Sequence, residues 1–333
     1  MGHRKKHAPR RGSLAFRPRG RAASLVVQPH YWPESSEAKI LGFAGYKVGM
    51  SHAFLLEDDQ TSPNYGREIF TPVTIIETPP ITVCALRAYE STVNGLKTTG
   101  EAWAQTLPKD LNRAIKPPPQ PKTEEALKKL EERLDHIAEF RAVICTHPSK
   151  AGVHKKKPEV FEAALGGKTP KEQLEFGKNI LGRDVDVASF VKAGQYVDVA
   201  AVTKGKGFAG PVKRFGVRIL QNKSRKTVRG IGCLGPWHPA MVTSTVARAG
   251  QMGFARRVEF NKRVLKVGAN GAEVTPKGGF LRYGTIRCPF IVLKGSVPGP
   301  AKRPVILRQP VRGAAKITPP NITLFPPHVA LAS

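Results

Sequence analysis

The feature that most constrains this chain is a run of sixty residues, 199–258, that holds twelve Lys and Arg but neither Asp nor Glu. Folded proteins normally mix both signs on their surfaces, because charges of one sign repel each other and destabilise the compact state. Gly and Pro recur along the run, so it does not form the amphipathic helix that binds acidic lipid. The run therefore requires a polyanionic partner, and nucleic acid fits best.

The excess of positive charge is confined to two regions of the chain. The 333 residues include 54 Lys and Arg and 25 Asp and Glu, a formal net charge of +29. Residues 1–30 hold eight basic and no acidic side chains, and residues 199–333 hold 24 basic and two acidic ones. Residues 31–198 sum to −1, so the middle of the chain is electrostatically ordinary.

Several classes of protein are excluded by the composition. No apolar run approaches the roughly 18–20 residues that cross a bilayer, and the Arg-rich N-terminus lacks the apolar segment of a signal peptide. No His stands at metal-ligand spacing from another His or Cys. We therefore expect a cytosolic protein with no membrane partner, no metal and no cofactor. Its four cysteines form no C-x-x-C pair and are expected to be reduced: Cys84, Cys145, Cys233 and Cys288.

The order of elements predicts a mainly β fold. Strand-like runs are interrupted once by a helical segment and once by the basic run, and helices do not alternate with strands, so an antiparallel β-barrel is the simplest closure. The expected regions are a basic N-terminal arm at 1–40, a first barrel segment at 41–100, a helical insertion with a short strand at 101–184, barrel strands at 185–203, a basic Gly/Pro-rich finger at 204–258 with its tip at 235–239, a second barrel segment at 259–318 and a C-terminal tail at 319–333.

Local patterns predict the individual elements. Leu127, Leu130, Leu134 and Ile137 form an apolar stripe with spacings of three and four residues. This stripe predicts a helix near 123–140. A capping box at Thr169 predicts a second helix that Gly182 closes. Runs rich in β-branched residues predict strands at 44–56, 71–79, 81–90, 141–148, 185–191, 195–203, 258–267, 284–293 and 304–311.

The finger opens with a glycine motif at 205–210 that reads G-x-G-x-x-G. A dinucleotide site needs a helix that starts at the third glycine and an acidic residue roughly 20 positions later. We expect Pro211 to block that helix, and the next acidic residue is Glu259. The glycines are therefore interpreted as letting the backbone approach a phosphate chain beside Lys204 and Lys206.

No arrangement of a nucleophile, a base and an orienting group can be found, so neither catalysis nor a small-molecule substrate is predicted. The structural RNA-binding interpretation leads, and two alternatives remain open. The first is an RNA-modifying enzyme that uses the same basic surface. The second is a nucleic-acid chaperone that acts on its own.

Six ordered segments closely resemble the ribosomal protein L3 family of the large ribosomal subunit, with the archaeal and eukaryotic branch as the nearer match. They lie at 43–52, 202–216, 225–230, 235–240, 247–257 and 289–308. The resemblance spans most of the chain, the basic arm included.

The resemblance implies a translation-protein-type barrel on the outer face of the large subunit, with two long basic extensions that enter large-subunit rRNA. It implies cytoplasmic ribosomes as the location, a role early in subunit assembly, neighbouring proteins that include protein L14, and a finger whose tip reaches toward the peptidyl-transferase centre. Gln251 stands where some bacterial members carry a methylated glutamine. Val228 replaces the modifiable His of eukaryotic relatives.

The residues expected to contact rRNA are basic, aromatic or polar side chains of the two extensions. Trp237 cannot occupy a regular helix or central strand between its flanking prolines, so it is expected at a turn where it stacks on a base; a core tryptophan is the alternative. The arm supplies Arg4, Lys5, Lys6, Arg10, Arg11, Arg17, Arg19 and Arg21. The remainder are Lys204, Lys206, Phe208, Lys213, Arg214, Lys223, Arg225, Lys226, Arg229, Trp237, His238, Arg248, Gln251, Arg256, Arg257, Lys302 and Arg303.

Overall fold

A computed structural model of the chain describes residues 9–313 and 318–324. The chain divides into two units, which we call the basic unit, residues 1–23 and 203–256, and the sheet unit, residues 24–202 and 257–333. Residues 24–40, predicted to belong to the arm, lie in the sheet unit, where Trp32 is buried. Its ring fills the space beside Gly42, where a Cβ would stand 2.7 Å from it.

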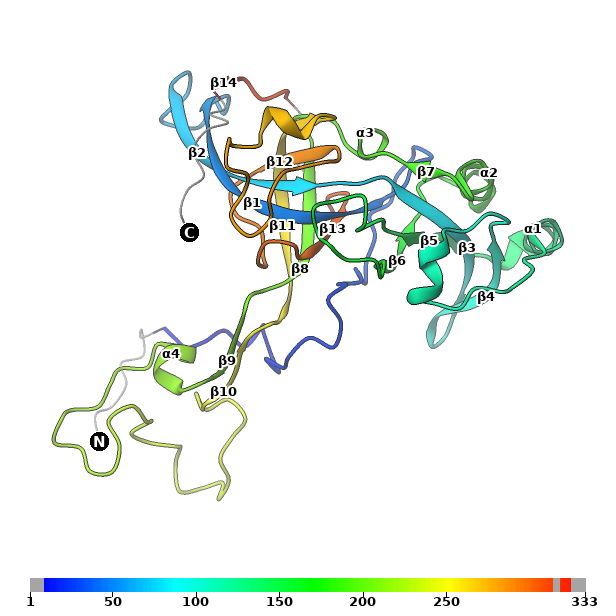
Figure 1. The fold of residues 1–333 in the computed structure, drawn as a ribbon. Coiled ribbons are helices and arrows are strands. Elements are labelled where there is room, and N and C mark those ends of the chain that lie inside the picture. Colours follow the sequence, from blue (N-terminus) through cyan, green and yellow to red (C-terminus); the bar gives the residue numbers. More distant parts are fainter. Residues whose placement is uncertain (1–8, 314–317, 325–333) are drawn as a thin grey trace. The chain divides into compact units, whose positions relative to one another are not determined.

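The first sheet of the sheet unit has the strand order β13-β8-β11-β12-β2-β1-β14 (Figure 1). β1 also pairs with β13, so the strands from β13 to β1 follow one another in a closed cyclic order. The pairings of β1 with β2, β13 and β14 are antiparallel, as are those of β12 with β2 and β11. The bounds are β1 Gly42–Leu56, β2 Glu68–Glu77, β8 Tyr196–Val202, β11 Arg256–Gly268, β12 Phe290–Lys294, β13 Pro304–Arg308 and β14 Ile322–Leu324. The predicted, mostly antiparallel β fold is thereby confirmed.

The core of this sheet is built from the alternating apolar residues of its strands. Tyr46, Val48, Ile75, Phe290 and Val292 pack in one buried cluster. Burying a large apolar side chain stabilises a fold by about 1.5–3 kcal/mol, so this cluster helps to hold the strands together.

The predicted strand at 284–293 is wrong in its first half, because β12 begins only at Phe290. The preceding residues form a loop whose backbone amides bind the fully buried carboxylate of Glu77. Arg287 N and Cys288 N donate to Glu77 Oε1 at 2.7 and 2.9 Å. A buried carboxylate needs such donors, and these amides are therefore not available to a strand ladder.

A second sheet occupies the middle of the chain, with the order β4-β3-β5-β6 and with β7 paired to β3. The segment 101–184 is therefore not a helical insertion with one short strand. Its strands β5 and β6 complete a sheet that β3 and β4 begin, because their apolar residues, such as Phe140, Ile144 and Phe161, need a shared buried face. The bounds are β3 Ile81–Thr92, β4 Gly95–Trp103, β5 Glu139–Cys145, β6 Val160–Ala164 and β7 Asp184–Val185.

Charged side chains on this second sheet neutralise one another. Arg87 pairs with Glu101 at 2.6 Å and also with Glu162. Tyr89 donates to Glu162 at 2.7 Å, and its ring lies 4.5 Å below the guanidinium of Arg141. Opposite charges that face each other across strands each stabilise a sheet by about 0.2–1 kcal/mol. These acidic and basic side chains are thus paired with one another within the sheet.

Two helices flank the second sheet. The capping box predicted for the second is confirmed, whereas the helix predicted near 123–140 ends at Glu132, so that Leu134 lies in a 3-10 turn and Ile137 is extended. In α1, Thr123–Glu132, Leu130 is buried and lies 3.0 Å from the position that a Cβ would take at Gly100. In α2, Pro170–Ile180, the Thr169 hydroxyl accepts the Glu172 amide at 3.3 Å, as a helix cap does. Short 3-10 turns span Lys109–Arg113, Leu134–His136 and Gly271–Glu273.

The predicted strand at 185–191 is also wrong beyond Val185. Its residues form a single helical turn, α3 Val187–Phe190, in which Val187 and Phe190 are buried. The Phe190 ring stacks on Phe43 at 5.7 Å between centroids. Packing against β1 therefore favours a helical turn here, although these residues have a high propensity for β-strands.

The cysteines are unpaired as predicted; Cys84, Cys145 and Cys288 are buried and Cys233 is exposed. Within the described residues, no helix is both long and apolar enough to cross a bilayer. In that same portion of the chain, no group of three or more His, Cys, Asp or Glu side chains is placed to hold a metal ion.

Candidate nucleic-acid interface

The basic unit is organised around a short antiparallel ribbon of β9, Gly205–Ala209, and β10, Gly250–Gly253 (Figure 1). The glycine motif at 205–210 thus forms a strand and not a loop. Gln251 stands opposite Phe208 in the ribbon register. The ribbon carries the two predicted contact residues side by side on neighbouring strands.

The prediction that Pro211 blocks a helix is wrong. A short helix, α4 Pro211–Phe215, begins there with Gly210 as its N-cap and ends at Gly216 in the left-handed region. Proline is well tolerated at the first helical position, where its missing N–H would have no partner. The basic unit still contains no acidic residue to bind a ribose, so the argument against a dinucleotide site now rests on that observation.

Arg214 binds the backbone of its own unit. Its Nε donates to the Gln251 carbonyl at 2.9 Å, and its Nη1 donates to the Arg248 carbonyl at 3.0 Å. The guanidinium also occupies the space beside Gly250, where a Cβ would lie 2.7 Å from Nη1. The side chain joins α4 to β10, a function that its sequence position did not indicate.

Residues 9–23 of the arm lie against the segment 203–256. Arg10 donates to the Thr245 carbonyl at 2.5 Å, although the two residues are 235 positions apart, and Arg11 binds the Gly216 carbonyl. The guanidinium of Arg19 lies 4.8 Å from the centre of the Phe215 ring. Two segments that were predicted to be separate extensions therefore form one unit.

The charged Lys, Arg, Asp and Glu positions of the basic unit are all Lys or Arg. Its residues include eight Lys and Arg in 1–23 and eleven in 203–256, with no Asp or Glu. Ion pairs such as Arg87–Glu101, Arg263–Asp58 and Arg308–Asp198 lie in the sheet unit. The predicted contact residues of the basic unit that are exposed are Arg10, Arg11, Arg17, Arg21, Lys204, Lys206, Phe208, Lys213, Lys223, Arg225, Lys226, Arg229, Trp237, His238, Arg248 and Arg256.

Other predicted contact residues are placed differently. Arg19, Arg214 and Gln251 are half-buried within the basic unit. Arg257, Lys302 and Arg303 are half-buried and belong to the sheet unit, where burial lowers the pKa of Arg303. Three further predicted residues lie outside the described residues of the chain: Arg4, Lys5 and Lys6.

Two aromatic side chains of the basic unit are unusually exposed. Phe208 is 81% exposed and Trp237 is 88% exposed, and Trp237 lies outside any helix or strand. The alternative interpretation of Trp237 as a core residue is therefore wrong. Exposed aromatic rings among cations are suited to stacking on unpaired bases.

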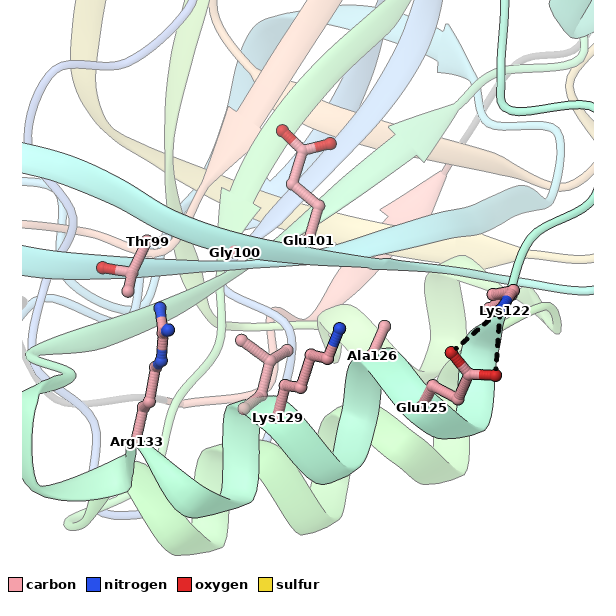
Figure 2. A pocket seen from close by; sticks show the side chains of 9 residues that line it. Thr99, Gly100, Glu101, Lys122, Glu125, Ala126, Lys129 and Arg133 are labelled. Carbon is pink, nitrogen blue, oxygen red and sulfur yellow. Dashed lines mark hydrogen bonds and ion pairs between the residues drawn. The ribbon is translucent and has the colours of Figure 1, made fainter.

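A cavity of about 290 Å³ lies between β4 and α1 (Figure 2). Lys122 and Glu125 pair with each other at 3.1 Å on its wall, and Glu101 is already paired with Arg87. The other lining residues are Thr99, Gly100, Ala126, Lys129, Leu130 and Arg133. Among these lining residues no nucleophile is paired with a base, so the cavity gives no support to an RNA-modifying activity.

Comparison with known proteins identifies the family. The family model described as Ribosomal protein L3 matches residues 1–321. The chain belongs to the ribosomal protein L3 family. This family consists of ribosomal proteins and not of enzymes, so the absence of a predicted catalytic group agrees with it.

Curated members of the L3 family resemble the chain over nearly its whole length. The large ribosomal subunit protein uL3 of Methanothermobacter thermautotrophicus is 49% identical over 315 residues, which cover 93% of this chain and 94% of that protein. The uL3 of Methanocaldococcus jannaschii is 49% identical over 91% of each chain. The uL3 of Methanococcus vannielii is 47% identical over 96% of each chain.

Proposed function

We propose that this L3-family chain is a structural protein of the large ribosomal subunit that binds large-subunit rRNA through its basic unit. The observation that carries the proposal is the one-sign charge of that unit, nineteen Lys and Arg without a single Asp or Glu. Phosphate groups neutralised by these side chains release their counterions, which supplies most of the binding free energy. The family match and the uL3 relatives support the assignment to the large subunit.

We assign the exposed side chains of the basic unit to two kinds of RNA contact, with phosphates and with bases. Lys204, Lys206 and Lys213 near the ribbon are placed to contact phosphates, which position the protein without reading sequence. Phe208 and Trp237 are placed to stack on unpaired bases, each contact being typically worth about 1–3 kcal/mol. Arg214 holds the unit in shape by binding carbonyl groups.

The finer assignments follow from the family resemblance. We propose that the cyclic strand order of the first sheet is a translation-protein-type barrel, that residues 204–258 form a finger directed toward the peptidyl-transferase centre, and that 235–239 is its tip. The protein then joins the subunit early in assembly in cytoplasmic ribosomes. Neighbouring large-subunit proteins, protein L14 among them, are its further partners.

Sedimentation tests the proposal directly. A tagged chain expressed in an archaeal host should sediment in sucrose gradients with the large subunit, at one copy per subunit. A chain that stays at the top of the gradient but binds rRNA would instead be a free RNA chaperone. Methyl transfer to rRNA from labelled S-adenosylmethionine by the purified chain would favour the modifying enzyme and overturn the structural role.

A further inference from the structure

An aromatic cluster lies on one face of the β1–β2 hairpin. His52 and Phe70 stack with ring centroids 4.8 Å apart, and Phe54 meets the edge of Phe70 at 5.6 Å. Phe54 is the register partner of both Phe70 in β2 and Leu324 in β14. Register partners share a face, so the cluster extends across three strands, β14, β1 and β2. Figure 1 labels these strands.

Two members of the cluster, Phe70 and Leu324, are open to solvent, whereas Phe54 is half-buried and His52 is buried, as is the opposite face of the same strands. Phe70 is 53% and Leu324 is 54% exposed. On the other face, Ala53, Leu55 and Thr71 are buried. Single exposed apolar residues are common on protein surfaces, but a contiguous apolar group marks an interaction site.

The surroundings of the cluster are acidic in a chain that carries +29 overall. The hairpin segment 57–68 has four acidic residues and one basic residue. Asp58 is neutralised by Arg263 at 2.8 Å, and this pairing holds the pKa of the Asp58 carboxyl well below its usual range. Asp59 and Glu68 are exposed and have no ion-pair partner among the described residues.

The charges decide what kind of partner fits this surface. Glu68 lies two residues before Phe70 on the same strand, so both side chains belong to one face. Carboxylates beside the aromatic rings repel phosphates, which disfavours RNA. They attract Lys and Arg side chains, so the surface fits a basic polypeptide that also carries an apolar side chain.

We propose that the face formed by His52, Phe54, Phe70 and Leu324, with the Glu68 carboxylate at its border, is a docking surface for a basic segment of a neighbouring protein. An apolar side chain of that segment covers Phe70, and its Lys or Arg side chains pair with Glu68 and Asp59. The inference rests on the proposed function, because it places the chain beside other proteins of the large subunit.

Site-specific cross-linking in assembled subunits tests the docking surface. The photoreactive residue p-benzoylphenylalanine replaces Phe70 in the full-length chain, and Val93 at the tip of the β3–β4 hairpin, which is fully exposed, is the control position. We expect position 70 to cross-link to one protein, at a peptide with a surplus of Lys and Arg, and position 93 not to reach that peptide. Cross-linking of position 70 to rRNA, no cross-link at all, or the same product from both positions would overturn the proposal.

Charge reversal provides a second measurement on the same subunits. Glu68→Lys and Phe70→Ser should lower the amount of the cross-linked protein retained after a salt wash by about two- to fivefold, as expected for an exposed contact. Asp135→Lys, an exposed acid on the second-sheet side of the sheet unit, should not. Equal retention in all three variants would contradict the docking surface. Sedimentation of the unmodified chain is scored separately, because its failure would overturn the proposed function instead.

Discussion

Gly253 lies against the backbone of Lys204, so that a Cβ at position 253 would stand 2.1 Å from the Lys204 carbonyl oxygen. Gly253 also has a φ of 70°, in the left-handed region. Both features arise where β10 meets β9, and together they require glycine at this position. The contact defines how closely the two strands of the basic ribbon approach each other.

Gly253→Ala should therefore open the ribbon, whereas Gly207→Ala is its matched control. Gly207 has a φ of 65°, but no atom lies within 4 Å of its would-be Cβ. The control should lose about 1 kcal/mol of local stability from backbone strain, and Gly253→Ala about 1–3 kcal/mol more from the clash. Hydrogen exchange of the Phe254 amide, which donates to Lys204 O at 3.1 Å, measures the difference. Equal exchange rates in both variants would show that the close approach is not required.

Removal of residues 204–257 should weaken the salt dependence of rRNA binding. If about six of the deleted basic groups meet phosphates, the log–log slope of affinity against salt should become shallower by roughly 4 to 5. Thr203 N lies 3.0 Å from the carbonyl of Ala255, three residues before residue 258, so a short Gly-Ser linker can join residues 203 and 258. A control with Lys116, Lys168 and Lys171 changed to Gln should keep nearly the full slope. An unchanged slope after the deletion would mean that these charges do not contact RNA.

Trp237→Ala should leave the thermal stability of the isolated protein unchanged, because the side chain is 88% exposed and buries little surface. The variant should still enter large subunits. Loss of a stacking contact worth about 1–3 kcal/mol should alter tRNA binding or peptidyl transfer by those ribosomes. A marked fall in melting temperature would show that Trp237 stabilises the folded protein and would contradict its assignment to a finger tip.

Charge reversal of Lys128 and Lys129 should leave subunit incorporation nearly intact. Both side chains are exposed on α1, and the sheet unit that carries them is otherwise close to neutral over residues 31–198. The helix packs through Leu130, which the substitutions do not touch. Quantification of the variant in gradient-purified subunits checks this, with circular dichroism to confirm folding. Severe loss of a folded variant from the subunit would place RNA contacts on α1.

Thiol reagents at about pH 8 should modify Cys233 alone in the native protein. Cys233 is exposed, whereas Cys84 and Cys145 are buried. Burial raises the pKa of Cys288 to about 11, so its reactive thiolate is scarce at that pH. Mass spectrometry should find one labelled cysteine before denaturation and all four afterwards. Early labelling of Cys288 would mean that the loop around Glu77 opens readily.

The positions of most strands and both main helices were predictable, because alternation and capping are local patterns. The assignment of strands to sheets was not. β3 and β4 share a sheet with β5 and β6 because Phe140, Ile144 and Phe161 form one buried face, which spacing along the chain does not reveal. The turn at Val187–Phe190 and the loop before Phe290 depart from prediction for the same kind of reason, since Phe43 and Glu77 are their distant partners.

The candidate site divides in a similar way. The exposure of the basic residues and of Trp237 was predictable from the sequence. Charged side chains without acidic partners are rarely buried, and an aromatic residue between prolines does not fit a regular core helix or strand. Neither the role of Arg214 in holding Gln251 and Arg248 nor the contact of Arg10 with Thr245 has a local signal. Both are hydrogen bonds to backbone carbonyls, which every residue offers alike.

By itself the sequence determined the family, the mainly β character and the segregation of positive charge, since these depend on residue identity and short-range order. Only the tertiary structure decided that residues 1–23 of the arm and the segment 203–256 form one unit and that an acidic, aromatic face remains open on the β1–β2 hairpin. The physical reason is that pairing over long separations depends on which buried surfaces and carbonyl groups meet once the chain is compact, and this information is shared among distant residues.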